Sequence, residues 1–108
     1  MGAPLAGSRV LIVDDEDLSR TLLARLVRRA GVGSVAFAAD GEEGRRKVMR
    51  FRPDVVVLDV EMPRMDGLEM CRRLRADLGE TALPVLFQTA GDSDEQQVRC
   101  FEAGGSDV

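Results

Sequence analysis

The stretch Val55-Val-Val-Leu-Asp59 is an unbroken run of β-branched and aliphatic residues that stops at a carboxylate. Continuous apolar runs of this length are typical of strands covered on both faces, as in a parallel sheet. A second run of the same kind, Val10-Leu-Ile-Val13, precedes Asp14 and Asp15. These two stretches predict buried strands that each carry acidic residues at the carboxyl end.

Outward from these runs, strand-like and helix-like segments alternate along the whole chain. Further strands are predicted over 34–38 and 84–88. The predicted helices begin near residues 17, 40, 68 and 92, and they end at Gly31, before Pro53, at Gly79 and at Gly104. This βαβαβαβα order predicts an α/β, doubly wound and mostly parallel sheet with helices on both faces.

The first predicted helix shows an apolar repeat. Leu18, Leu22, Leu26 and Ala30 recur at i+4 spacing, and the arginines of this segment lie largely on other faces of the helix. Asp17 is a plausible N-cap residue at its start. The repeat predicts that the leucines face the core.

Composition limits the chain to one domain and removes several function classes. It has 108 residues, a formal net charge of −4 and no Trp or Tyr, which argues against nucleic-acid binding through this domain. The absence of histidine excludes Ser-His and Cys-His nucleophile pairs and most zinc sites. Cys71 and Cys100 match no metal-ligand spacing, and we expect buried reduced thiols. No apolar stretch suits a membrane span or signal peptide, so we expect a cytoplasmic protein with no membrane contact.

Polar residues follow three of the predicted strands at the same edge of the sheet. They are Asp14 and Asp15, Asp59 and Thr89. If the first and third strands are neighbours, the three carboxylates share one pocket, and a hard divalent cation such as Mg²⁺ relieves their repulsion. Such a site indicates phosphoryl transfer with Asp59 as nucleophile. Taken singly, Asp14 and Asp15 are also typical of helix caps, Asp59 of a turn and Thr89 of a β-branched strand position.

Four segments resemble the receiver domain of two-component response regulators. They are Arg9-Val-Leu-Ile-Val-Asp-Asp-Glu-Asp17, Val55-Val-Val-Leu-Asp-Val-Glu-Met-Pro-Arg-Met-Asp-Gly67, Gln88-Thr-Ala90 and Phe101-Glu-Ala-Gly-Gly-Ser-Asp-Val108. The second segment is highly specific for this family. The resemblance implies a flavodoxin-like sheet of strand order 2-1-3-4-5.

The family resemblance also implies roles for individual residues. Asp59 would accept a phosphoryl group from a sensor histidine kinase or phosphotransfer protein. Mg²⁺ would be held by Asp14, Asp15, Asp59 and the backbone carbonyl of Glu61, and Thr89 would be the switch hydroxyl. Phosphorylation would then act on an output domain or partner protein.

Two features depart from the family pattern. The family lysine that binds the phosphoryl group follows the segment matching 104–108, where this sequence stops, and the only lysine, Lys47, is expected to point away from the site. We therefore expect residues 1–108 to form a receiver domain that lacks its last strand and helix. A bare sheet edge and a possible homodimer follow from that expectation. Val108 stands where the family often has an aromatic residue.

The sequence favours a phosphoaccepting signalling switch that catalyses only its own phosphorylation and dephosphorylation. One alternative is a phosphorylation-independent interaction module, which the missing lysine favours. The other is an aspartyl-phosphate phosphatase or phosphotransferase. That class needs an acid/base aspartate two positions after the nucleophile, where this chain has Glu61.

Overall fold

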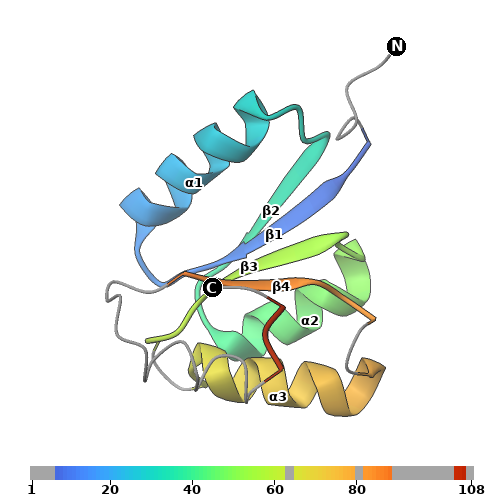
Figure 1. Ribbon diagram of the computed structural model, residues 1–108. Helices are drawn as coiled ribbons and strands as arrows, with labels where there is room; N and C mark the ends of the chain where they lie inside the picture. The colour runs from blue at the N-terminus through green and yellow to red at the C-terminus, as the bar shows by residue number, and fades with distance from the viewer. Residues whose placement is uncertain (1–6, 63–64, 80–81, 89–103, 107–108) are drawn as a thin grey trace.

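A computed structural model describes residues 7–62, 65–79, 82–88 and 104–106 and shows a parallel sheet between two layers of helices (Figure 1). The elements are β1 (Arg9–Val13), α1 (Asp17–Arg29), β2 (Ser34–Ala38), α2 (Gly41–Phe51), β3 (Val55–Asp59), α3 (Gly67–Leu78) and β4 (Val85–Gln88). The strand order is β2-β1-β3-β4, and every strand pair is parallel. The α/β fold class and the order 2-1-3-4 are therefore confirmed. The fourth predicted helix lies outside the described residues.

β1 is buried on both faces, as its continuous apolar sequence predicts, whereas β3 is buried on one face and half-buried on the other. Leu11 and Val13 of β1 point to one face, whereas Val10 and Ile12 point to the other, and all four are buried. In a parallel sheet, the crossover helices pack against both faces. The side chains of a central strand are therefore covered on both sides. Because β1 and β3 are the two central strands, their carboxyl ends lie side by side at the middle of one end of the sheet.

The helices divide unequally between the faces: α1 covers one, and α2 and α3 cover the other (Figure 1). The α2/α3 face holds the larger core, in which Met70 and Leu74 are almost fully buried against the sheet. The α1 face has a smaller core built on Val10, Ile12 and Ala24. Cys71 is buried in the larger core and forms no disulfide, as expected, while Cys100 lies outside the described residues.

The predicted core stripe of α1 is wrong. Leu18, Leu22 and Leu26 are 68%, 49% and 62% exposed. Ala24 is the buried residue of this helix, with Leu23 and Val27 half-buried beside it. The side of the helix formed by Leu23, Ala24 and Val27 therefore faces the sheet, where Ala24 packs with Val10 and Ile12 of β1.

Of the two helix N-caps predicted from the sequence, the one at α2 is confirmed and the one at α1 is wrong. Asp40 caps α2 by accepting a hydrogen bond from the amide of Glu43 (2.9 Å), as predicted. At α1 the N-cap is Glu16, which makes no side-chain cap bond, and Asp17 is already the first helical residue. Asp17 therefore does not serve as the cap that its position suggested.

None of the described helices combines the length and the apolar character needed to cross a membrane.

The outer edge of β4 is not wholly bare. The amide of Ser106 donates to the carbonyl of Val85 (2.8 Å), and the Val85 amide donates to Ser106 Oγ (3.1 Å). The buried Arg75 of α3 reinforces this pairing through bonds to the carbonyls of Leu83 (2.6 Å) and Gly104 (2.8 Å). The sequence predicted that the outer edge of β4 would be open. This prediction is wrong for Val85, the first residue of β4, which pairs with Ser106.

Candidate functional site

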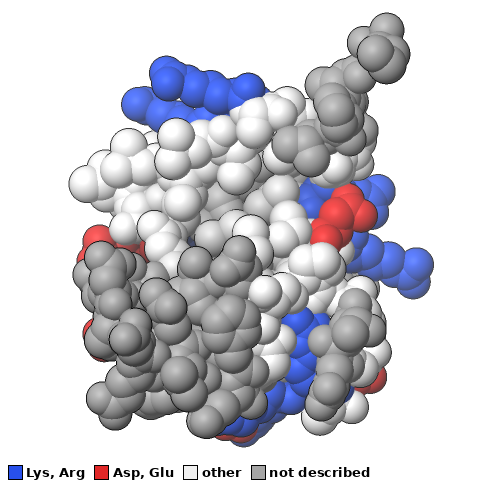
Figure 2. All heavy atoms as spheres, in the orientation of Figure 1, with Lys and Arg blue, Asp and Glu red and all other residues white. Residues whose placement is uncertain are grey.

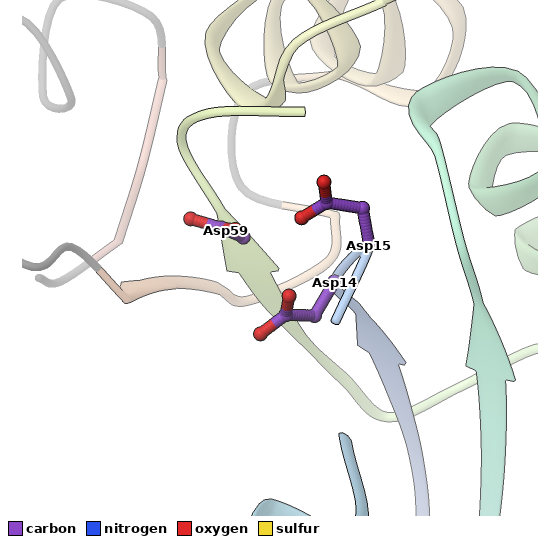
Figure 3. Close-up of side chains that lie close together, drawn as sticks. All are labelled: Asp14, Asp15 and Asp59. Carbon is purple, nitrogen blue, oxygen red and sulfur yellow. The ribbon is translucent and has the colours of Figure 1, made fainter. Parts of the chain in front are cut away.

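Three carboxylates meet at the carboxyl ends of the two central strands (Figure 3). Asp14 and Asp15 follow β1, and Asp59 is the last residue of β3, the neighbouring strand. Each residue offers one carboxylate oxygen to a group whose members all lie within 4.8 Å of one another. The structure therefore brings together the three acidic residues that the sequence predicted to share a pocket.

Asp14 is held by the backbone around it. Its amide continues the pairing of β1 with β2 by donating to the carbonyl of Ala38 (3.0 Å). Its Oδ1 accepts the amide of Glu16 (2.9 Å), and the side chain is buried. Asp14 therefore shapes the turn into α1, as a capping interpretation requires, and also faces the carboxylate cluster. The neighbouring Asp15 is exposed.

Arg20 is a residue of the site region that the sequence did not single out. From the first turn of α1, its Nη1 donates to the backbone carbonyl of Asp14 (2.6 Å), and its guanidinium pairs with Asp17. The side chain is mostly covered, in contrast to the solvent-facing position that its charge suggested. An arginine six residues after an acidic strand end was the only sequence feature that could have identified it.

Asp59 is positioned by β3 and by the start of α3. Its Oδ1 accepts the amide of Glu61 (3.3 Å). The amide of Gly67 donates to the carbonyl of Val60 (2.9 Å), and a Cβ at Gly67 would lie 2.0 Å from the carbonyl oxygen of Asp59. Only glycine fits there, because the obstructing atom belongs to the backbone. Asp66 then caps α3 by accepting the amide of Glu69 (2.9 Å).

The electrostatic state of Asp59 reflects the crowding. Partial burial and, after it, the charge of Asp14 raise the pKa of Asp59 from 3.8 to about 6. Asp15 also raises this pKa, while amide hydrogen bonds from Glu61 and Val60 lower it. The cluster therefore disfavours a third negative charge and favours a bound cation.

The donor set fits a magnesium-like ion. Three carboxylates supply only hard oxygen ligands, and one of them, Asp15, is exposed to solvent. The chain's only lysine is not part of this group: Lys47 Nζ contacts the carbonyl of Phe37 and lies 3.4 Å from Glu43 Oε1. Glu61 is exposed beside Asp59, and Thr89 lies outside the described residues.

Sequence comparison gives a consistent family. Residues 10–108 match the family described as the response regulator receiver domain. Response regulator MprA of Mycobacterium leprae is 46% identical over 99 residues, covering 92% of this chain and 42% of that protein. The alkaline phosphatase synthesis transcriptional regulatory protein PhoP of Bacillus subtilis is 39% identical, over 92% of this chain and 40% of that protein. The chain thus spans about two fifths of the length of these curated relatives.

Solved structures give the same fold. Chemotaxis protein CheY4 of Vibrio cholerae superposes with a TM-score of 0.83 at 32% identity, covering 93% of this chain and 82% of that chain. The receiver domain of the histidine kinase CKI1 from Arabidopsis thaliana, complexed with Mg²⁺ and BeF₃⁻, superposes with a TM-score of 0.82 at 28% identity. That match covers 94% of this chain and 78% of the other.

Proposed function

Because this chain belongs to the response regulator receiver domain family of two-component signalling proteins, we propose that Asp59 accepts a phosphoryl group and thereby switches a partner. The observation that carries the proposal is the convergence of Asp14, Asp15 and Asp59 within 4.8 Å at one end of the sheet. Phosphoryl transfer needs such a site, since the chemistry depends on positioning and on neutralising charge.

Asp59 is the nucleophile in this proposal. One ionised carboxylate oxygen attacks phosphorus, and an O–P bond forms while the bond from phosphorus to the donor breaks. The donor's leaving group keeps the electron pair and takes up a proton from solvent. Hydrolysis by water later returns the carboxylate and inorganic phosphate. Asp59 suits the role because it ends a central strand, and the next residue, Val60, accepts a hydrogen bond from Gly67 at the start of α3.

Asp14, Asp15 and Asp59 would hold Mg²⁺ together with the backbone carbonyl of Glu61. When bound, the ion supplies positive charge that offsets the negative charge of the phosphoryl oxygens. The chain's own residues supply the rest: the Glu61 amide orients the Asp59 carboxylate, and the Asp14 turn holds the cluster in place. We assign Thr89 as the hydroxyl that contacts the phosphoryl group and couples it to the switch.

The phosphoryl donor in this proposal is a sensor histidine kinase or a phosphotransfer protein. The recipient of the switch is an output domain or a separate partner. PhoP of B. subtilis bears the name of a transcriptional regulatory protein, and such an output suits a chain that matches only part of its length.

A phosphorylation-independent interaction module is the second candidate. It is favoured by the engagement of Lys47 with Phe37 and Glu43, which leaves no lysine at the site within the described residues. A phosphoryl anion without a lysine partner loses a strong charge-assisted contact.

Acetyl phosphate with Mg²⁺ distinguishes the two candidates when intact mass is measured. We expect the wild-type chain to gain one phosphoryl group and Asp59→Asn to gain none. Asp77→Asn, which changes an exposed carboxylate paired with Arg45, is the matched control and should be labelled like wild type. Label that persists in Asp59→Asn would show that another residue is the nucleophile.

Metal binding is measured separately by titration with Mg²⁺ or Mn²⁺. Asp15→Asn should weaken binding at least about tenfold, because it removes one of the few charged ligands. Wild-type protein that binds Mg²⁺ and yet takes no phosphoryl group would favour the interaction module.

A further inference from the structure

Arg20 differs from the other arginines of α1. Arg25, Arg28 and Arg29 are exposed, and in the part of the chain that the structure describes their side chains make no hydrogen bond or ion pair. Figure 2 shows Lys and Arg side chains extending from the surface over α1. The Arg20 side chain is only 18% exposed. Covering a guanidinium group costs hydration, so the contacts that Arg20 makes in return indicate its role.

The contacts of Arg20 lie at the turn that carries the first two carboxylates of the cluster. Its Nη1 donates to the backbone carbonyl of Asp14 (2.6 Å), and its guanidinium pairs with Asp17. Asp17 is 91% exposed, and an ion pair with such a group contributes little. The hydrogen bond to the Asp14 carbonyl is therefore the contact that distinguishes Arg20.

The carbonyl of Asp14 belongs to the peptide group that leads into Asp15. A peptide group is planar, so a hydrogen bond that fixes the direction of this carbonyl also fixes the direction of the Asp15 amide. On its other side, Asp14 donates its own amide to the carbonyl of Ala38 at the end of β2 (3.0 Å). The backbone of Asp14 is thus held from both sides, by β2 and by Arg20 of α1.

Asp15 depends on this support more than the other two carboxylates do. Asp14 and Asp59 each accept an amide hydrogen bond on Oδ1, from Glu16 and Glu61. The side chain of Asp15 is exposed and accepts no hydrogen bond from any residue that the structure describes. Its direction is therefore set mainly by the backbone from which it starts.

We propose that Arg20 is a positioning residue of the metal site, which holds the Asp14 carbonyl and thereby directs the Asp15 carboxylate toward the position shared with Asp14 and Asp59. Arg20 acts through the backbone and is not a ligand, because a guanidinium group has no acceptor atom to offer an ion. The inference rests on the proposed function in one respect only, namely that the cluster binds a divalent cation.

The charge of Arg20 gives the proposal a distinctive sign. A guanidinium group close to the cluster repels a cation, so loss of its charge alone should tighten Mg²⁺ binding. Loss of support for Asp15 should have the opposite effect, because the ligand must then be ordered when the ion binds. Removing a partner that orients a metal ligand typically weakens binding by about 10–100-fold. Since the two effects of Arg20 oppose each other, we expect a net weakening of about fivefold.

Isothermal titration calorimetry of the 108-residue chain with Mg²⁺ tests the sign. Arg20→Met should weaken binding about fivefold. Arg20→Lys should stay within about twofold of wild type, because its ammonium group can still donate to the Asp14 carbonyl. Arg28→Met removes the same charge from an exposed position in the last turn of α1 and should leave the affinity unchanged. Circular dichroism checks that each variant is folded.

A double-mutant cycle tests whether Arg20 acts through Asp15. In the Asp15→Ala background no carboxylate remains for Arg20 to direct. Arg20→Met should then no longer weaken binding of Mn²⁺, measured by the electron paramagnetic resonance signal of the free ion. An equal weakening in both backgrounds would show that Arg20 acts by another route and would overturn the proposal.

The remaining outcomes separate this inference from the proposed function. Unchanged or tighter Mg²⁺ binding in Arg20→Met, with Asp59 of the wild type still labelled by acetyl phosphate, would refute the role of Arg20 and leave phosphoryl acceptance in place. Weaker binding in Arg20→Met, with no labelling of the wild type, would support Arg20 and refute phosphoryl acceptance. An equal loss in Arg20→Lys and Arg20→Met would also count against the proposal, because lysine retains a donor for the Asp14 carbonyl.

Discussion

The two faces of the sheet differ in how completely they are covered. On the α2/α3 face, large side chains such as Met70 and Leu74 fill the space between helix and sheet and are almost fully buried. On the α1 face, Val57 is half-buried and Leu86 is exposed, although both face the helix side of the sheet. Stability is therefore concentrated on one face, and the other face retains exposed apolar surface.

Leucine truncation on each face gives the largest contrast. Leu74→Ala should lower the free energy of unfolding by about 2–5 kcal/mol, because it leaves a cavity in a close-packed core. Leu26→Ala should change it by less than about 0.5 kcal/mol, because that side chain is exposed. Urea unfolding of the two variants measures the difference. Equal losses of unfolding free energy in the two variants would show that both faces of the sheet contribute equally to stability.

Gly67→Ala tests how tightly the α2/α3 face is joined to the site. The new Cβ would meet the carbonyl oxygen of Asp59 at 2.0 Å, so α3 or β3 must move. We expect a loss of about 3 kcal/mol, at the upper end of overpacking effects, together with slower phosphoryl acceptance. Gly79→Ala at the other end of α3 serves as control, since no atom obstructs its Cβ and it is remote from Asp59. Its strain should reduce stability alone, and equal slowing of acceptance in both variants would contradict the link.

The N-termini of α2 and α1 should also differ in their contribution to the free energy of unfolding, by a smaller amount. Asp40→Ala removes the cap bond to Glu43 on α2 and should cost about 1 kcal/mol. Asp17→Ala on α1 removes no cap bond and should cost less than about 0.5 kcal/mol, since it loses only a surface ion pair with Arg20. Thermal unfolding of both variants measures this. A larger loss for Asp17→Ala would contradict the capping assignment.

The pH dependence of stability tests the carboxylate cluster. The pKa of Asp59 is raised to about 6 in the folded chain from 3.8, so its stabilising contribution is present below pH 3.8 and is lost as the pH rises through 6. In the absence of divalent cations, Asp59→Asn should therefore gain stability over wild type as the pH rises to about 7. The group is only partly buried, and solvent screening should keep the gain to about 1 kcal/mol.

Urea unfolding of wild type and Asp59→Asn across this pH range gives the difference directly. Saturating Mg²⁺ should reduce the advantage of the variant, because the ion stabilises the ionised cluster only in the wild type. A difference that does not vary with pH would mean that Asp59 is not crowded by charge.

The sheet could be predicted from the sequence because its determinants are local. The apolar runs Val10–Val13 and Val55–Leu58 are continuous, so the prediction of burial on both faces did not require knowledge of the neighbouring elements. Helix ends at Pro53 and Gly79 follow equally from local backbone limits. These features depend on residue type more than on tertiary contacts.

The orientation of α1 could not be predicted in the same way. The spacing of Leu18, Leu22 and Leu26 shows that they share a side, and it does not show which side approaches the sheet. Ala24 and Val27 form an alternative apolar side that packs closer to β1. Only the tertiary structure distinguishes the two sides.

At the candidate site, the acidic residues were predictable and their supports were not. Asp14, Asp15 and Asp59 end strands, and parallel strands bring those ends together. Arg20 donates to the backbone carbonyl of Asp14, and Gly67 leaves space for the backbone carbonyl of Asp59. Every residue has a backbone carbonyl, so the sequence does not indicate which one is contacted. The roles of Thr89 and of the Glu61 carbonyl stay predictions.

Arg75 has a consequence for the way the chain returns to β4. Its guanidinium donates to the carbonyl groups of Leu83 and Gly104, and Ser106 pairs with Val85. One buried side chain of α3 therefore holds together two parts of the chain that are 21 residues apart. Closing a loop costs entropy whenever its ends must be brought together, and these hydrogen bonds offset part of that cost. Loss of the Arg75 guanidinium would thus release both the start of β4 and residues 104–106 from α3.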